Sequence, residues 1–312
     1  EMGAGFTWAG NSRLHQVTGW SNDALTDPPA EQLLLHDLDS DRVWPLGALL
    51  LPPEDGKRLV RHGLGFSAMQ QRVAGIDVAL SWCVDRRQSV KQLLAVLRLP
   101  PDAPPRRLRL VATARWQLGA GGAERLTLAT QAHRFGGDSA GVGLPARREV
   151  LGLLATQLDE QPGFGGSTAF LSLRGDAPGQ APVGADPQDW TCDRRELHGP
   201  GGAAVLPRRL GRRQGLGLDP CAAIGLSLTL AAGSDRAVCV LLGHADSADA
   251  ARALLAEAWA MPPTDRLAEQ RAQWFDRLGA VQVRTPDSAF DALVNHWLPY
   301  QTLASRLWAR AG

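Results

Sequence analysis

The 312-residue sequence has almost no net charge and no long apolar run. Its 33 Lys and Arg residues balance 32 Asp and Glu residues, which gives no reason to expect nucleic acid or an anionic membrane as a partner. No apolar stretch approaches the ~18 residues of a membrane span, and no N-terminal signal segment is visible. We expect this piece to be cytoplasmic. We also expect this sequence to be a segment of a longer chain that was cut at Glu1 and Gly312. Whether that longer chain is bound to an inner membrane stays an open question.

Cysteine and the usual catalytic motifs are also scarce. The four cysteines form no C-x-x-C pair and have no histidine at zinc-finger spacing. Cys83 and Cys239 lie in apolar runs, as buried thiols do, so we expect a reducing compartment without disulfides, with two bridges as the alternative. No G-x-S-x-G, H-E-x-x-H or phosphate-binding glycine loop is present. The sequence predicts no metal and no cofactor.

The carboxylates form no convincing catalytic or calcium-binding group. Asp23, Asp27 and Glu31 are four apart, but Pro28-Pro29 prevents a helix that would align them. The acidic residues of segment 37–41 lack the glycine and glutamate of an EF-hand and indicate a solvated hairpin turn. An independent glycosidase would need two carboxyls about 5 to 10 Å apart in one cleft, and we keep it as the least favoured hypothesis.

Short alternating segments bounded by Gly, Pro, Asp and Ser predict an antiparallel β-sandwich. The strands are expected at 31–37, from 42 to a stop at Pro45, and at 76–84, 90–99, 108–118, 126–132, 149–157, 168–173, 222–231 and 236–242. The last two are expected to form a hairpin through residues 232–235. Along the segment 108–118, one face is apolar, and Arg109 and Arg115, together with the preceding Arg107, lie on the other face. This row of arginines is most simply exposed to solvent; the alternative is that it binds a ligand.

From Ser247 onward the apolar period is helical. Asp246 or Ser247 is expected to cap the first helix, and Pro262-Pro263 to end it. A second helix is expected at Asp265–Leu278, capped by Thr264. A third, capped by Thr285 and kinked by Pro299, has a wide apolar side that needs another layer to cover it.

The segment Phe6–Asp23, FTWAGNSRLHQVTGWSND, surrounds two tryptophans with small polar groups. Sugar recognition combines aromatic faces for the C–H surface of a pyranose with amides, carboxylates and guanidinium groups for its hydroxyls. The alternative is a loop with both tryptophans in the core. A second candidate is Arg61-His62, which is either a loop facing a ligand or a strand end with an exposed histidine.

Five segments carry a resemblance to a known family. They are FTWAGNSRLHQVTGWSND, RHGLGFS (Arg61–Ser67), Trp116 with Leu118-Gly119, GLGLDPCAA (Gly215–Ala223) and VQVRTPDSAFDALVNHWLPYQTLASRLWAR (Val281–Arg310). In this order they resemble the glycoside hydrolase family 94 module, formerly glycosyltransferase family 36, found near the C-terminus of bacterial cyclic β-1,2-glucan synthases.

The resemblance implies a mainly β fold, a galactose mutarotase-like supersandwich at 1–245. It further implies a helical linker at 246–284 and, at 285–312, the first helix of an (α/α)6 barrel that holds the catalytic residues. The implied function is carbohydrate binding in a phosphorylase-type protein acting on β-1,2-glucan, with inversion and with inorganic phosphate as co-substrate. The alternative is a sandwich that only braces the barrel and a dimer interface. Implied partners are the glucan, the barrel and, as an open question, a second copy. The candidate sugar contacts are Trp8, Asn11, Ser12, Arg13, Trp20, Asn22 and Asp23, followed by Arg61 and His62.

Overall fold

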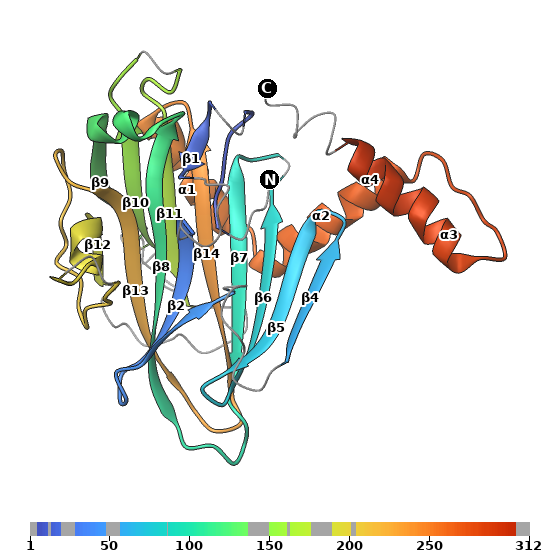
Figure 1. Cartoon of the computed structure of the whole chain (residues 1–312), viewed down its shortest axis with the longest axis horizontal. Coiled ribbons are helices and arrows are strands. Elements are labelled where there is room, and N and C mark those ends of the chain that lie inside the picture. The colour runs from blue at the N-terminus through green and yellow to red at the C-terminus, as the bar shows by residue number, and fades with distance from the viewer. Residues whose placement is uncertain are drawn as a thin grey trace, which may run out of the picture.

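The computed structural model describes residues 5–11, 14–19, 29–47, 57–85, 87–136, 150–160, 163–175, 189–200 and 204–303. It consists of two antiparallel sheets and a C-terminal helical arm (Figure 1). The larger sheet has the order β4-β5-β6-β7-β14-β11-β10-β9, and the smaller has β12-β13-β8-β2-β3 with β1 paired to β8. The strands are β1 (Gln16–Thr18), β2 (Glu31–Asp37), β3 (Val43–Leu46), β4 (Arg58–Gly63), β5 (Phe66–Val73), β6 (Ile76–Val84), β7 (Val90–Arg98), β8 (Arg106–Gly119), β9 (Leu128–Phe135), β10 (Val150–Gln157), β11 (Thr168–Arg174), β12 (Asp189–Asp193), β13 (Pro220–Leu230) and β14 (Asp235–Ala245).

The two sheets enclose one hydrophobic core, which confirms the predicted sandwich. Strand β8 shows how the sequence pattern produces it: Leu108, Leu110 and Trp116 alternate along the strand and are fully buried against the other sheet. Because successive strand residues point to opposite faces, one alternating segment can supply the core on one side and polar groups on the other.

Three local predictions in the strands are wrong. The link at 231–234 is no hairpin, because β13 belongs to the smaller sheet and β14 to the larger, so the chain crosses between the layers there. Pro45 lies within β3, opposite Leu34, where an edge strand tolerates the missing N–H. The β2–β3 hairpin forms as expected, but Asp37 is buried, with Arg106 and the N–H groups of the turn bound to its carboxylate.

The prediction that the arginines of β8 are exposed to solvent is confirmed for Arg107 and wrong for Arg109. Arg109 is 1% exposed and donates to the Asp189 carboxylate and to the carbonyl of Pro207. The segment after β12, with Pro207 and Leu210, therefore covers this part of the outer face of the smaller sheet, and Asp189 of β12 pairs with Arg109 on the same face. The sequence pattern of β8 could not reveal this cover, because the covering residues lie about 80 to 100 positions further along the chain.

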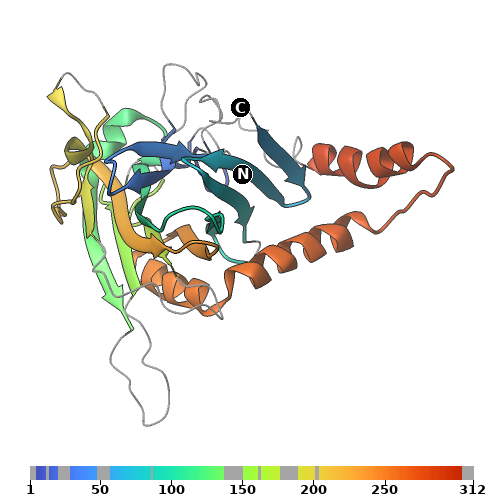
Figure 2. The ribbon, with the colours of Figure 1, turned by 90° about the horizontal axis from the view of Figure 1, so that it is seen from below.

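The helical arm begins on the outer face of the larger sheet. Helix α1 (Ala248–Ala260) is capped by Ser247, as expected, and packs Ala251 and Leu255 against Phe170. Helix α2 (Pro263–Leu278) then leads away from the sandwich (Figure 2). Its N-cap is Pro262, so the prediction of Thr264 as a cap is wrong.

After α2 the chain turns back through α3 (Ser288–Ala292), a π-helical turn (Leu293–Trp297, labelled η4) and α4 (Leu298–Leu303). Asp287, and not Thr285, caps α3. The N–H of Leu298 bonds to the carbonyl of Leu293, and this wider turn directly precedes Pro299, which has no N–H to donate. Several large apolar side chains of the arm are exposed: Phe275, Val281, Phe290, Leu293, Trp297 and Leu298. Within the described ranges, no helix is long and apolar enough to cross a membrane.

Candidate functional site

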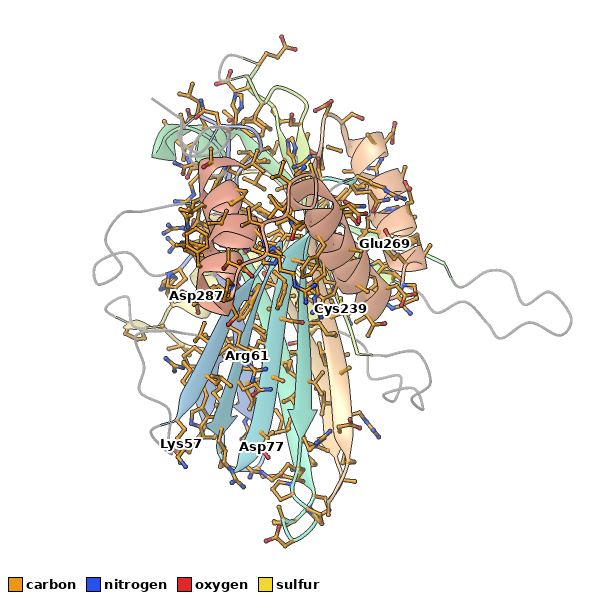
Figure 3. The ribbon with its side chains drawn as sticks, turned by 90° about the vertical axis from the view of Figure 1, so that its right-hand side faces the viewer. Lys57, Arg61, Asp77, Cys239, Glu269 and Asp287 are labelled. Atoms are coloured by element: carbon orange, nitrogen blue, oxygen red, sulfur yellow. The ribbon has the colours of Figure 1, made fainter. Side chains whose placement is uncertain are left out.

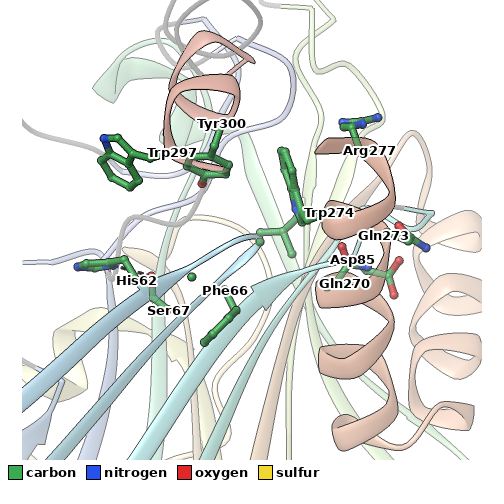
Figure 4. A pocket seen from close by; sticks show the side chains of 13 residues that line it. His62, Phe66, Ser67, Asp85, Gln270, Gln273, Trp274, Arg277, Trp297 and Tyr300 are labelled. Atoms are coloured by element: carbon green, nitrogen blue, oxygen red, sulfur yellow. Dashed lines mark hydrogen bonds between the residues drawn. The ribbon is translucent and has the colours of Figure 1, made fainter. Parts of the chain in front are cut away.

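A cavity of about 490 Å³ lies where the helical arm meets the ends of β4, β5 and β6 (Figure 4). The β4–β5 hairpin forms one wall, α2 a second, and the η4–α4 segment a third. Lys57 and Asp77 mark the opposite ends of these strands, far from the helices (Figure 3). The cavity is within the usual size range of small-molecule sites, about 300 to 1,000 Å³.

Aromatic rings from two helices face the cavity. Trp274 of α2 meets Tyr300 of α4 edge to face, with ring centroids 5.1 Å apart, and Trp297 stacks on Tyr300 at 6.4 Å. Trp297 is 49% exposed, so much of its ring surface is available. Arg277 lies 5.5 Å over the Trp274 ring and adds a cationic group to the rim.

The β4–β5 hairpin supplies polar groups and a close approach of the backbone. His62 Nδ1 and Ser67 Oγ are hydrogen-bonded at 2.9 Å. Gly65 has φ +73°, and a Cβ placed there would overlap the Trp274 ring. Because Gly65 has no side chain, the Trp274 ring can lie directly on the backbone of the β4–β5 hairpin. Any other residue at position 65 would prevent this contact.

The floor of the cavity is rigid. Asp85, at the end of β6, accepts a hydrogen bond of 3.0 Å from Arg266, whose guanidinium is 1% exposed and also donates to Gln92 and to the carbonyl of Ala258. This fully paired cluster fixes α2 to the larger sheet. Gln273 also contributes to the lining, but its Oε1 atom is buried out of contact with solvent and has no hydrogen-bond partner within the described part of the chain.

The opening segment lies elsewhere and is held by a buried ion pair. Lys91 of β7 donates to Glu31 of β2 at 2.7 Å and to the carbonyl of Phe6 at 3.2 Å. The other carboxylate oxygen of Glu31 accepts from the hydroxyls of Thr7 and Thr18, each at 2.6 Å. The opening segment is therefore tied to both sheets at once.

The predicted sugar contacts separate into three groups. Trp8 is half-buried and stacks on Phe6 at 5.4 Å, and Asn11 Oδ1 accepts from the N–H of Leu14; neither lines the cavity. His62 lines it, whereas Arg61 is exposed on β4 and does not (Figure 3). Five candidates lie outside the described residues: Ser12, Arg13, Trp20, Asn22 and Asp23.

The residues that sequence reasoning missed are Gln273, Trp274, Trp297 and Tyr300. The two tryptophans and the tyrosine lie in segments predicted as helices, where aromatic residues at helical spacing are usually part of the core. A signal was nevertheless present, since Tyr300 is the single tyrosine of the chain and follows Trp297 by three residues. No group of three or more His, Cys, Asp or Glu side chains suited to a metal occurs among residues that the structure describes.

The fold defines the chain as a large antiparallel β-sandwich domain with a helical arm. The chain belongs to the family described as "Glycosyl hydrolase 94, supersandwich domain", which matches residues 1–259. It is 31% identical over 315 residues to the cyclic beta-(1,2)-glucan synthase NdvB of Rhizobium meliloti (strain 1021), covering 99% of this chain and 10% of that protein. The family expected from the sequence is thereby confirmed, and the chain spans about a tenth of that relative.

Two solved structures align with much of this chain at low sequence identity. A bacterial glucoamylase complexed with acarbose aligns with a TM-score of 0.47 at 8% identity, covering 86% of this chain and 32% of that one. A GalM/aldose epimerase homologue from C. elegans aligns with a TM-score of 0.33 at 13% identity, covering 65% of this chain and 70% of that one.

Proposed function

We propose that this chain is a carbohydrate-binding domain whose sugar site is the cavity between the β4–β5 hairpin, α2 and α4. The observation that carries the proposal is the meeting of three aromatic rings, Trp274, Trp297 and Tyr300, on the lining of one cavity. The rings suit the apolar face of a pyranose, and the polar side chains of His62 and Ser67 on the same lining suit its hydroxyls.

The roles of these residues are stacking and positioning. His62 binds Ser67 through Nδ1, which leaves Nε2 for a ligand hydroxyl. Asp85 is the one carboxylate among the described residues of the cavity lining, and Arg266 already binds it. A glycosidase or phosphorylase needs a carboxylic acid free to protonate the leaving oxygen. The cavity therefore favours binding without turnover.

The larger protein is part of the proposal. The membership in family 94 and the name of the rhizobial relative support a protein that acts on β-1,2-glucan. We propose phosphorolysis with inversion, with inorganic phosphate as co-substrate and with catalytic residues supplied by an (α/α)6 barrel outside this chain. Residues 1–245, 246–284 and 285–312 would then be the sandwich, the linker and the first barrel helix. Dimerisation and a cytoplasmic location belong to the same hypothesis.

A bracing role is the second candidate for the opening segment. The Lys91–Glu31 pair and the two threonine hydroxyls hold this segment against both sheets, which is what a structural element requires. Under this alternative Trp8 and Asn11 make no sugar contact.

Calorimetric titration with linear β-1,2-glucooligosaccharides tests the cavity. Trp297→Ala should weaken binding about tenfold, since loss of one stacked ring removes about 1 kcal/mol or more. Leu298→Ala is the matched control, because both side chains are 49% exposed and only Trp297 lines the cavity. Equal affinity in wild type and Trp297→Ala would refute this placement of the site, and absence of any binding would refute the proposed function.

A further inference from the structure

The near-neutral charge of the whole chain hides one strongly basic loop. Residues 208–213 read Arg-Arg-Leu-Gly-Arg-Arg, which places four arginines in six positions without an acidic residue. All four side chains are exposed, Arg208 by 62% and Arg213 by 58%. The loop lies against β12, on the side of the sandwich away from α2 and α4 (Figure 1). It is therefore a surface separate from the aromatic cavity.

The backbone of this loop is held in place by the strand and the turn that precede it. The N–H of Leu210 donates to the Asp189 carboxylate at 2.8 Å, and the N–H of Gly211 donates to the Glu196 carboxylate at 2.7 Å. The Leu210 side chain is 2% exposed and anchors the loop in a small apolar cluster. A fixed backbone presents the arginines on a defined surface, so that little backbone entropy is lost when a partner binds.

Two of the four arginines have no role within the chain. Arg208 and Arg213 form ion pairs with carboxylates of neighbouring segments. For the side chains of Arg209 and Arg212, the described residues offer no hydrogen-bond or ion-pair partner. Arg212 also has φ +58°, in the left-handed region that favours glycine, and its N–H donates to the carbonyl of Trp190 at 2.8 Å. An arginine kept at a strained position without an internal partner indicates a partner outside the chain.

The exposure of the loop favours an extended anionic surface over a small anion. All four guanidinium groups lie on the open surface, so they do not enclose a small ligand. Val205, which is 48% exposed, precedes the loop, and Leu216, which is 63% exposed, follows it. Basic residues together with exposed aliphatic ones are typical of segments that lie on anionic membranes: the cations bind phosphate headgroups, and the apolar groups enter the interface. An acidic protein surface would complement only the charges.

We propose that the loop 208–213, with the flanking Val205 and Leu216, docks this domain on a lipid bilayer that contains anionic phospholipids. Arg209 and Arg212 supply charge that no carboxylate of the described structure neutralises. In this orientation the helical arm and its aromatic cavity stay accessible, because they lie on the other side of the sandwich (Figure 1). The inference is independent of the proposed function, since it requires no sugar in the cavity.

Sedimentation with large vesicles tests the inference. The wild-type protein should bind vesicles of phosphatidylcholine with about 30% phosphatidylglycerol and should not bind vesicles of phosphatidylcholine alone, and about 0.5 M salt should release it. Arg209→Ala and Arg212→Gly should each weaken binding about fivefold, the contribution typical of one basic side chain at an anionic membrane surface. Arg87→Ala is the matched control, because Arg87 is also exposed and unpaired in the described structure but lies between β6 and β7. It should change binding less than about twofold, since distant charges are screened.

Arg212→Gly also separates binding from folding. Glycine adopts φ +58° without strain, so this variant should be no less stable than the wild type in urea while binding vesicles more weakly. Leu216→Ser should weaken binding to the anionic vesicles and leave any binding to soluble poly-L-glutamate unchanged.

Three results would overturn the inference. The first is equal binding of the wild type to both kinds of vesicle, or binding to neither. The second is binding to anionic vesicles that is unchanged in both Arg209→Ala and Arg212→Gly. The third is tighter binding to poly-L-glutamate than to anionic vesicles, with no effect of Leu216→Ser on either, which would show that the partner is an acidic protein.

Discussion

Replacing Lys91 by methionine removes the cation from a buried pair that joins the two sheets. Lys91 is 5% exposed and its partner Glu31 is 13% exposed. Removal of one partner from such a pair typically costs about 3 to 5 kcal/mol, because the other charge stays buried and uncompensated. Here Thr7 and Thr18 still donate to the other oxygen of Glu31, so the loss should lie at the lower end, about 3 kcal/mol.

Equilibrium unfolding in urea, followed by circular dichroism, measures this loss as a fall in the transition midpoint at constant slope. Lys57→Met is the matched control, since Lys57 is the only other lysine and is exposed on the way into β4. It should change the free energy of unfolding by less than about 0.5 kcal/mol. A double variant with Glu31→Gln should be more stable than the sum of the two single losses predicts. A Lys91→Met loss below about 1 kcal/mol, or strict additivity in the double variant, would contradict the assigned role of the pair.

Three further predictions concern other parts of the molecule. Gly65→Ala should destabilise the fold and displace Trp274, which would appear as a shift in tryptophan emission. The control is Gly75→Ala, which has a similar positive φ but lies in open space and should lose only about 1 kcal/mol of stability through backbone strain. Equal effects of the two substitutions would contradict the contact between Gly65 and Trp274. The pKa of Asp37 is about 2, because hydrogen bonds from backbone N–H groups and from Arg106 outweigh burial, which would raise it. The stability that the ionised carboxylate provides above pH 4 should therefore fall by about 2 kcal/mol as the pH drops through 2. Asp37→Asn should make the free energy of unfolding less dependent on pH in this acid range. All four cysteines are buried free thiols, and burial raises the pKa of Cys83 to about 12. A thiol reagent at pH 8 should therefore label no cysteine in the native protein and all four in denaturant. Rapid labelling of the native protein would contradict this burial.

The strands that sequence predicted best are those with strong local patterns. Glu31–Asp37 and Ile76–Val84 have the predicted bounds, and β8 contains the alternating segment 108–118. Strand β5 was not predicted and β4 only as a possible strand end at Arg61-His62, because Gly63, Gly65 and the polar residues around them resemble a loop. Pairing with a neighbouring strand, and not intrinsic preference, makes them strands.

The candidate site shows the same division. His62 was a sequence candidate because of its glycine neighbours, and it lines the cavity. Trp274 and Tyr300 belong to helices whose apolar pattern is equally consistent with a core, so their meeting in a cavity depends on how α2 and α4 are placed.

By itself, the sequence determined the family, the antiparallel sandwich, the change to helices near residue 247 and the absence of familiar catalytic motifs. Each of these depends on residue identity and spacing within short segments. Only the tertiary structure decided that β13 and β14 lie in different sheets, that Arg109 and Asp37 are buried, and that Trp274, Trp297 and Tyr300 line one cavity. These features arise from contacts between residues far apart in the chain, where packing and burial, and not local preference, determine the lowest free energy.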